Sequence, residues 1–85
     1  MKNNTILILG SKRFVDEMVE LSSVYKKKGY KTMVADHTFN YNLNYLPIHT
    51  VYIYNKFSFI PFEVYNVIKQ AKELGIHIEY YNNEV

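Results

Sequence analysis

Short apolar runs alternate with amphipathic stretches along this chain, and this alternation constrains its fold more than any other feature. The continuous apolar run Thr5–Leu9 is followed by apolar residues at helical spacing, and a second helical stretch follows Thr50–Tyr54. Strands that alternate with helices are typical of α/β proteins, whose helices return the chain to the start of the next parallel strand. The four expected strands are Thr5–Leu9, Lys31–Ala35, Thr50–Tyr54 and Ile76–Tyr80.

Two helices are expected between these strands. Ser11 can cap the first, which ends at the run Lys26–Lys28 and Gly29, since cations suit the end of a helix dipole and glycine adopts left-handed backbone. Its apolar stripe comprises Phe14, Met18, Leu21 and Tyr25. The second helix is expected to begin near Pro61 and to end at Gly75. Its stripe comprises Val64, Val67, Ile68, Ala71 and Leu74.

Right-handed crossovers allow few strand orders for this pattern, and we favour 2-1-3-4, in which the direction of winding reverses after the second strand. A chain of 85 residues provides one modest core. The sequence therefore predicts a single domain over residues 1–85. Its class is a small Rossmann-like or flavodoxin-like α/β domain with two main helices.

This strand order leaves half of one sheet face without a helix. The bare half is formed by the last two strands, with tyrosines such as Tyr52 or Tyr54 and Tyr80. Parallel sheets are normally covered on both faces, and a domain of this size is marginally stable alone. We therefore expect a homodimer or a larger homo-oligomer.

Composition excludes several classes of site. The absence of cysteine excludes disulfides, thiolate nucleophiles and cysteine-ligated metals. The spacing of His37, His49 and His77 fits no metal site, so we expect neither a metal nor another cofactor. The apolar run Ile6–Leu9 is too short for a signal or membrane segment, which favours a cytoplasmic protein without membrane contact. The net charge of +2 gives no reason to expect a nucleic acid polymer as partner.

The segment His37–Ile48 has a period of two. Its apolar members alternate with asparagines. The alternating residues are Phe39, Tyr41, Leu43 and Tyr45 on one side and Asn40, Asn42 and Asn44 on the other. The segment either lies on the sheet with its asparagines in water, or forms a ligand lid or a partner-binding edge.

Candidate binding residues stand where strands end, because open α/β sheets bind ligands outside the carboxyl ends of strands at the switch point. After the first strand, a hydroxyl, two cations and backbone N–H groups could hold a phosphate or ribose oxygen, or simply form a helix cap. These residues are Gly10, Ser11, Lys12, Arg13 and Phe14. After the third strand, the Asn55 amide could hydrogen-bond a hydroxyl or a base edge, and the ring of Phe57 or Phe59 could stack. The candidate residues there are Asn55, Phe59, Ile60 and Pro61, and Asp36 after the second strand could accept from a ribose hydroxyl or cap a turn.

Three segments resemble the nucleoside 2-deoxyribosyltransferase-like family: G-S-K-R-F, Y-N-K-F-S-F-I-P and K-E-L-G-I-H-I-E-Y-Y. The resemblance covers most of the chain and puts Ser58–Pro61 at the family's G-Y-I-G-like turn. It also puts Val67 where the family has a catalytic glutamate, and a valine cannot attack an anomeric carbon. Glu63, one helical turn earlier, could replace that nucleophile or merely suit the helix dipole.

Three functions follow as hypotheses. The first is a non-catalytic protein that binds a nucleoside, nucleotide or ADP-ribose-like ligand through Ser11, Arg13, Asn55 and Phe59, and that could sequester a signalling nucleotide as phage anti-defence sponges do. The second is a deoxyribosyltransferase or N-glycosidase-like enzyme that uses Glu63. The third is a structural interaction module with a vestigial cleft.

Overall fold

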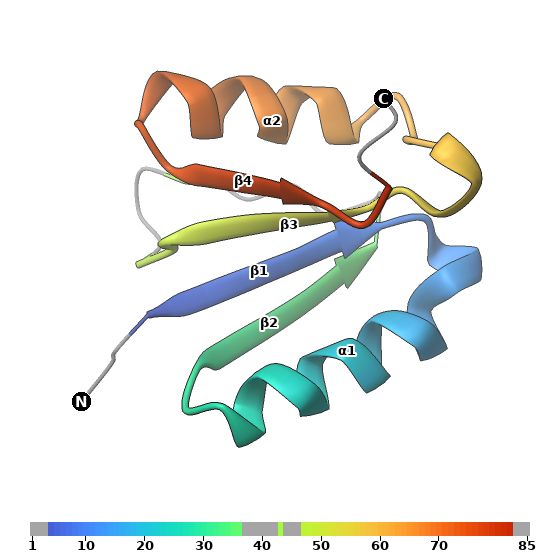
Figure 1. Ribbon diagram of the computed structural model, residues 1–85. Coiled ribbons are helices and arrows are strands. Elements are labelled where there is room, and N and C mark those ends of the chain that lie inside the picture. The colour runs from blue at the N-terminus through green and yellow to red at the C-terminus, as the bar shows by residue number, and fades with distance from the viewer. Residues whose placement is uncertain (1–3, 37–42, 44–46, 83–85) are drawn as a thin grey trace.

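The sheet has four parallel strands in the order β2-β1-β3-β4 in the computed structural model, which describes residues 4–36, 43 and 47–82 (Figure 1). The strands are β1 Thr5–Gly10, β2 Lys31–Asp36, β3 Thr50–Tyr54 and β4 His77–Tyr80. Strand β1 pairs with both β2 and β3, and β3 pairs with β4. The predicted fold class, strand order and parallel orientation are confirmed.

One helix lies on each side of the sheet: α1 at Val15–Lys27 and α2 at Val64–Glu73 (Figure 1). Both begin later than predicted. Ser11 caps a short 3-10 turn, η1 at Lys12–Phe14, and its Oγ accepts from the Arg13 N–H at 3.3 Å. Pro61 belongs to the turn before α2, where its carbonyl accepts from the Val64 N–H at 3.0 Å.

The face under α2 carries the larger core. Leu7, Val51 and Ile53 point into it from the strands, and the predicted helix stripe covers them. The buried members of that stripe are Val64, Val67, Ile68 and Ala71. Leu74 was expected among them, but it is 43% exposed and lies just beyond the end of α2 at Glu73. Leu43 is also buried in this core, and its N–H donates to Gln70 Oε1 at 3.0 Å. The rest of the alternating segment Phe39–Tyr45 lies outside the described residues.

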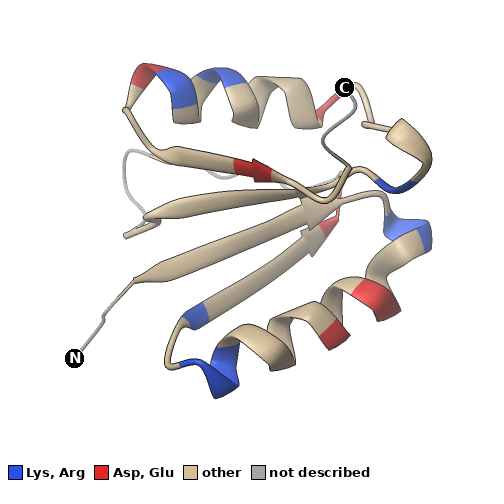
Figure 2. Ribbon diagram, in the orientation of Figure 1, with Lys and Arg blue, Asp and Glu red and all other residues tan. Residues whose placement is uncertain are grey.

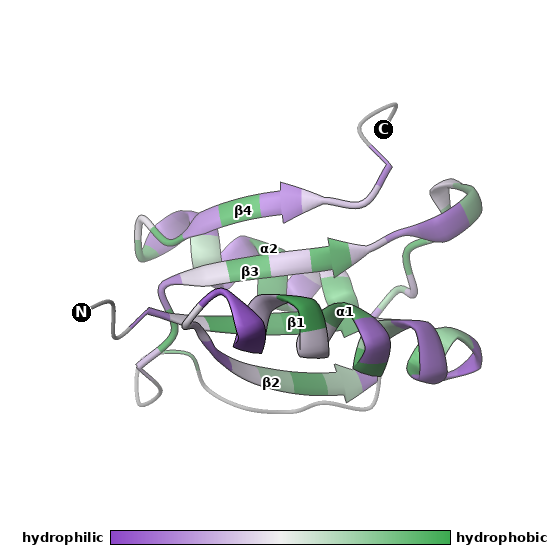
Figure 3. Cartoon of the chain, turned by 60° about the horizontal axis from the view of Figure 1, so that its bottom comes forward, coloured by the Kyte–Doolittle hydropathy of each residue, from purple (hydrophilic) through white to green (hydrophobic). Residues whose placement is uncertain are grey.

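The face under α1 carries a smaller core of Ile6, Ile8, Phe14, Met18 and Tyr54. Helix α1 packs against β1 and β2, so among the described residues no helix covers the β3 and β4 half of this face (Figure 3). There Tyr52 is half-buried, and the side chains of His77 and Glu79 are 66% and 49% exposed.

The prediction that Tyr80 lies on this open half is wrong. Tyr80 pairs with Ile53 in the β3-β4 ladder and therefore shares its face. It packs against the core under α2. Tyr52 pairs with Glu79 and lies on the opposite face, as expected.

Candidate functional site

Four of the predicted site residues line one hollow. Ser11, from the turn after β1, faces Phe59, Pro61 and Glu63, from the segment that connects η3 (Lys56–Ser58) to α2. Phe62 completes the lining, and the volume is about 220 Å³. The residues meet because β1 and β3 are parallel neighbours whose carboxyl ends share one edge of the sheet.

An unusual backbone turn leads into the hollow. Phe57 and Ser58 are consecutive residues in left-handed conformation, with φ of 59° and 61°. A bulky residue rarely adopts positive φ, and such strain persists only where the surroundings fix it. Hydrogen bonds fix this turn: the Ser58 N–H donates to the Asn55 carbonyl at 2.9 Å, and Asn82 Nδ2 bonds Ser58 Oγ at 2.7 Å.

Asn55 does not line the hollow, but it holds the neighbouring backbone in place. Its side chain is fully buried. Asn55 Nδ2 donates to the Asn82 carbonyl at 2.9 Å, and the Asn82 N–H donates to Asn55 Oδ1 at 2.7 Å. This pair of hydrogen bonds attaches the segment after β4 to the end of β3.

The other predicted residues surround the hollow at different depths. Lys12 and Arg13 are exposed on the turn between β1 and α1, where the basic residues stand out in Figure 2. Phe14 is buried, and its ring centroid lies 5.9 Å from that of Tyr54. Ile60 packs against the core under α2. Asp36, which pairs with Gly10 in the β1-β2 ladder, is not among the lining residues.

Gly10 lets three elements pack closely together. A Cβ at this position would lie 2.9 Å from the Tyr54 carbonyl oxygen and 3.2 Å from Met18 Sδ. Both distances are too short for unstrained contacts, so the glycine allows β1, β3 and α1 to meet at the end of the strand.

A charged cluster lies beside the hollow, on the α1 side of the sheet. Glu17 accepts from Lys56 Nζ at 2.8 Å and from the Tyr54 hydroxyl at 2.6 Å. These two hydrogen bonds lower the pKa of Glu17. The pKa of Lys56 is raised by the same carboxylate, and the pKa of Tyr54 is raised by burial and then by Glu17.

Phe62 was not predicted as a site residue, although the spacing of the apolar residues around it indicates that its ring is exposed. The buried residues Val64, Val67, Ile68 and Ala71 recur at helical spacing, and Phe62 is out of phase with them. An aromatic residue next to a helix but off its buried stripe is expected to be exposed. Phe62 is 82% exposed.

The groups at the hollow are suited to hydrogen bonding and to the stacking of rings. Two aromatic rings, a hydroxyl and a carboxylate converge there, with two cations on the neighbouring turn. Val67, which the resemblance aligns with a catalytic glutamate, is 4% exposed in the core under α2. Within the described residues, no three histidine, aspartate or glutamate side chains gather as a metal site would require.

Neither α1 nor α2 is long and apolar enough to cross a membrane, and the described part of the chain has no other helix that is. Comparison of the chain with protein-family models, with curated proteins and with solved structures finds no match in any of the three.

Proposed function

We propose that this protein binds a nucleoside- or nucleotide-type small molecule in the hollow beyond the carboxyl ends of β1 and β3, and that it does not convert that ligand. One observation carries the proposal: residues singled out separately after two strands line the same hollow at the switch point of the sheet. Ligands of open α/β sheets bind at this place.

The size of the hollow limits what enters it. Sites that enclose a whole drug-sized molecule have roughly 300–1,000 Å³, whereas this hollow has about 220 Å³. It therefore suits one ring system, such as a base or a ribose, with the remainder of the ligand on the adjoining surface. Phe59 and Phe62 are 49% and 82% exposed. Exposed rings of this kind can stack on the face of a base, and burial of their apolar surface by the base favours binding.

Polar groups near the rings suit the other parts of a nucleotide. The Glu63 carboxylate can accept hydrogen bonds from ribose hydroxyls, and the Ser11 hydroxyl can donate one. Phosphates need cations instead, and Lys12 and Arg13 are exposed on the turn that carries Ser11. This arrangement would place the sugar near Glu63 and any phosphate near Lys12 and Arg13, away from the carboxylate.

The absence of turnover rests on Val67. A buried valine occupies the position that the resemblance aligns with the family's nucleophile. A protein that binds such a ligand and leaves it intact would act by holding it. Sequestration of a signalling nucleotide, as in phage anti-defence sponges, is the role we propose on this basis.

A second candidate function is kept because Glu63 itself lines the hollow. In that case Glu63 would attack the anomeric carbon of a nucleoside, and the base would leave. This enzyme would release a free base, whereas the binding protein would return its ligand unchanged.

Titration calorimetry and product analysis with pooled nucleosides and nucleotides test both functions. Replacement of Phe59 by alanine should weaken binding at least about fivefold, since stacking on one ring contributes about 1–3 kcal/mol. Tyr65→Ala is the matched control, because Tyr65 is 53% exposed on α2 and does not line the hollow. Glu63→Gln should weaken nucleoside binding while no base is released by either protein.

Each of the other outcomes decides against the binding proposal. Base release that disappears in Glu63→Gln while binding persists would establish the enzyme. If Arg13→Ala and Phe59→Ala leave binding unchanged, or if nothing binds at all, the chain is an interaction module and the hollow is vestigial.

A further inference from the structure

The flank of α1 beside the open half of the sheet carries an ordered stripe. Glu20, Val24 and Lys28 recur every four residues and Leu21 lies beside them, so they line one side of the helix and the residue that follows it. The stripe is acidic at Glu20, apolar at Leu21 and Val24 and basic at Lys28, and Figure 2 shows acidic residues toward the start of α1 and basic residues at its end.

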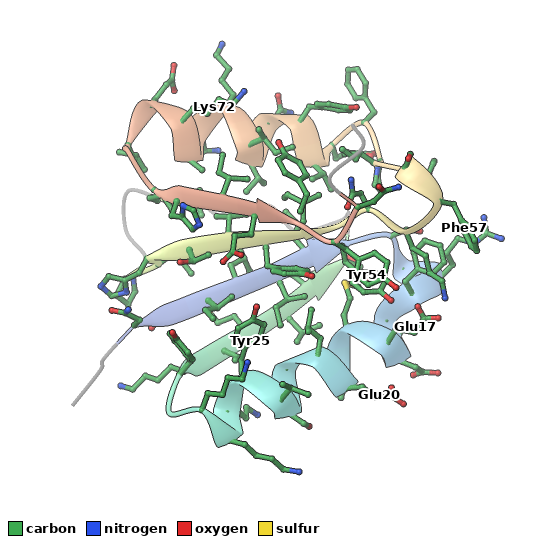
Figure 4. All side chains as sticks on the ribbon, viewed as in Figure 1. Glu17, Glu20, Tyr25, Tyr54, Phe57 and Lys72 are labelled. Atoms are coloured by element: carbon green, nitrogen blue, oxygen red, sulfur yellow. The ribbon has the colours of Figure 1, made fainter. Side chains whose placement is uncertain are left out.

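The stripe borders a second hollow, distinct from the candidate ligand site. Its volume is about 390 Å³, and Leu21, Val24 and Glu20 line it opposite Tyr54 and Tyr81. The ion pair of Glu17 with Lys56 also lines it, so the charge of Glu17 is balanced within the chain. The Tyr54 and Tyr81 rings stack with centroids 4.5 Å apart. Figure 4 shows Glu17 of α1 and Tyr54 of β3 side by side, where the Tyr54 hydroxyl donates to Glu17.

Apolar and aromatic groups are left uncovered there. Val24 is 48% exposed, Tyr81 is 49% exposed and Tyr52 is only half-buried. Tyr52 also contacts Tyr25, with ring centroids 6.1 Å apart. A parallel sheet whose face is half covered, beside exposed apolar residues, is typical of a surface that another molecule covers.

We propose that a second copy of this chain covers this surface, with the α1 helices of the two copies antiparallel about a two-fold axis. The charge order of the stripe identifies the occupant. Antiparallel pairing places the acidic end of each stripe against the basic end of the other, and it brings Leu21 and Val24 of the two copies together near the axis. Parallel pairing would place like charges together.

This interface is independent of the ligand site, because the two hollows share no lining residue. A failure of ligand binding therefore leaves the interface untouched. Variants at Phe59 or Glu63 are expected to dimerise as the wild-type chain does.

Sedimentation equilibrium of the wild-type chain and two matched variants tests the interface. Val24→Lys should raise the dimer Kd roughly a hundredfold. Because the dimer is symmetric, the substitution puts one lysine from each copy into the apolar centre of the interface. Val19→Lys is the control, because Val19 is 51% exposed on the other flank of α1. A wild-type chain that stays monomeric at its highest soluble concentration, or equal weakening by both variants, would overturn the proposal. Circular dichroism verifies that both variants keep their fold.

Charge reversal tests the antiparallel arrangement. Glu20→Lys and Lys28→Glu should each weaken the dimer, since each places like charges at both ends of the interface. The two changes together restore opposite charges and should return the Kd to near the wild-type value. A double variant that dimerises more weakly than either single variant would contradict antiparallel pairing.

Discussion

The two faces of the sheet are covered to different extents, although they belong to the same four strands. Under α2, the core extends from β1 across β3 and takes in Ile78 and Tyr80 of β4. Under α1, the core stops at β3, where Tyr52 is half-buried, and Glu79 of β4 is exposed.

The difference arises from chain topology. The crossover from β1 to β2 carries α1 along one edge of the sheet, while the crossover from β3 to β4 carries α2 along the other. Because crossovers are right-handed, the two helices lie on opposite faces. Each helix covers only about half of its face of the four-stranded sheet, so other residues must bury the remaining apolar surface. Leu43 and Ile48 do so under α2, and a second copy of the chain is our proposal for the face under α1.

The strongest test of this contrast compares neighbouring residues of β3 that point to opposite faces. Ile53 is 1% exposed under α2, and Ile53→Ala should lower the free energy of unfolding by about 3 kcal/mol, since it removes buried methyl groups and leaves a cavity. Tyr52→Ala on the open half should lower it by about 1 kcal/mol. Urea unfolding at a concentration where the chain is monomeric measures both. Equal losses would mean that the faces do not differ.

The next effect concerns the closed part of the α1 face. Gly10→Ala should destabilise the protein by about 2 kcal/mol, because the added methyl group is forced against the Tyr54 carbonyl and Met18. Ser23→Ala, at an exposed position of α1, is the control and should change little. Thermal unfolding of the two variants measures the effect. A Gly10→Ala protein as stable as wild type would show that β1, β3 and α1 are not packed closely there.

A smaller effect concerns Leu43, which adds to the core under α2. Gln70→Ala removes the acceptor of the Leu43 N–H and should lower the free energy of unfolding by about 1 kcal/mol. Amide hydrogen exchange at Leu43 should also become faster. Lys69→Ala, on the exposed side of the same helix, should alter neither quantity. Unchanged exchange in Gln70→Ala would show that this hydrogen bond does not hold the segment.

The smallest effect concerns pH at the border of the open half. The pKa of Glu17 lies below its ordinary 4.5 in the folded protein, chiefly through Lys56. Its contribution to stability is therefore present above the unfolded pKa and is lost as the pH falls through the folded pKa. Glu17→Gln should flatten this part of the stability curve in denaturant titrations at a series of pH values. Identical curves for the two proteins would exclude Glu17 as a source of acid sensitivity.

The sheet could be predicted from the sequence because its strands are short apolar runs and right-handed crossovers leave few orders. Four residues of the candidate hollow could be predicted for the same reason, since strand ends at a switch point come together. The contacts of side chains across the fold could not. Nothing local in the sequence indicates that Asn82 occupies the amide of Asn55, or that Lys56 bonds Glu17, because these partners are separated by 27 and 39 positions. The face to which Tyr80 points depends on the register of β4, because a shift by one residue would move every side chain of this strand to the opposite face.

The central claim, ligand binding at the end of β1 and β3, is tested most directly by mapping amide chemical shifts of the labelled protein during titration with pooled nucleosides and nucleotides. We expect the changes to concentrate at Ser11 and at Phe59, Phe62 and Glu63, with further changes at Lys12 and Arg13 for phosphorylated ligands. Spectra that do not change with any of these compounds, or changes confined to the flank of α1 at Leu21 and Val24, would contradict the account.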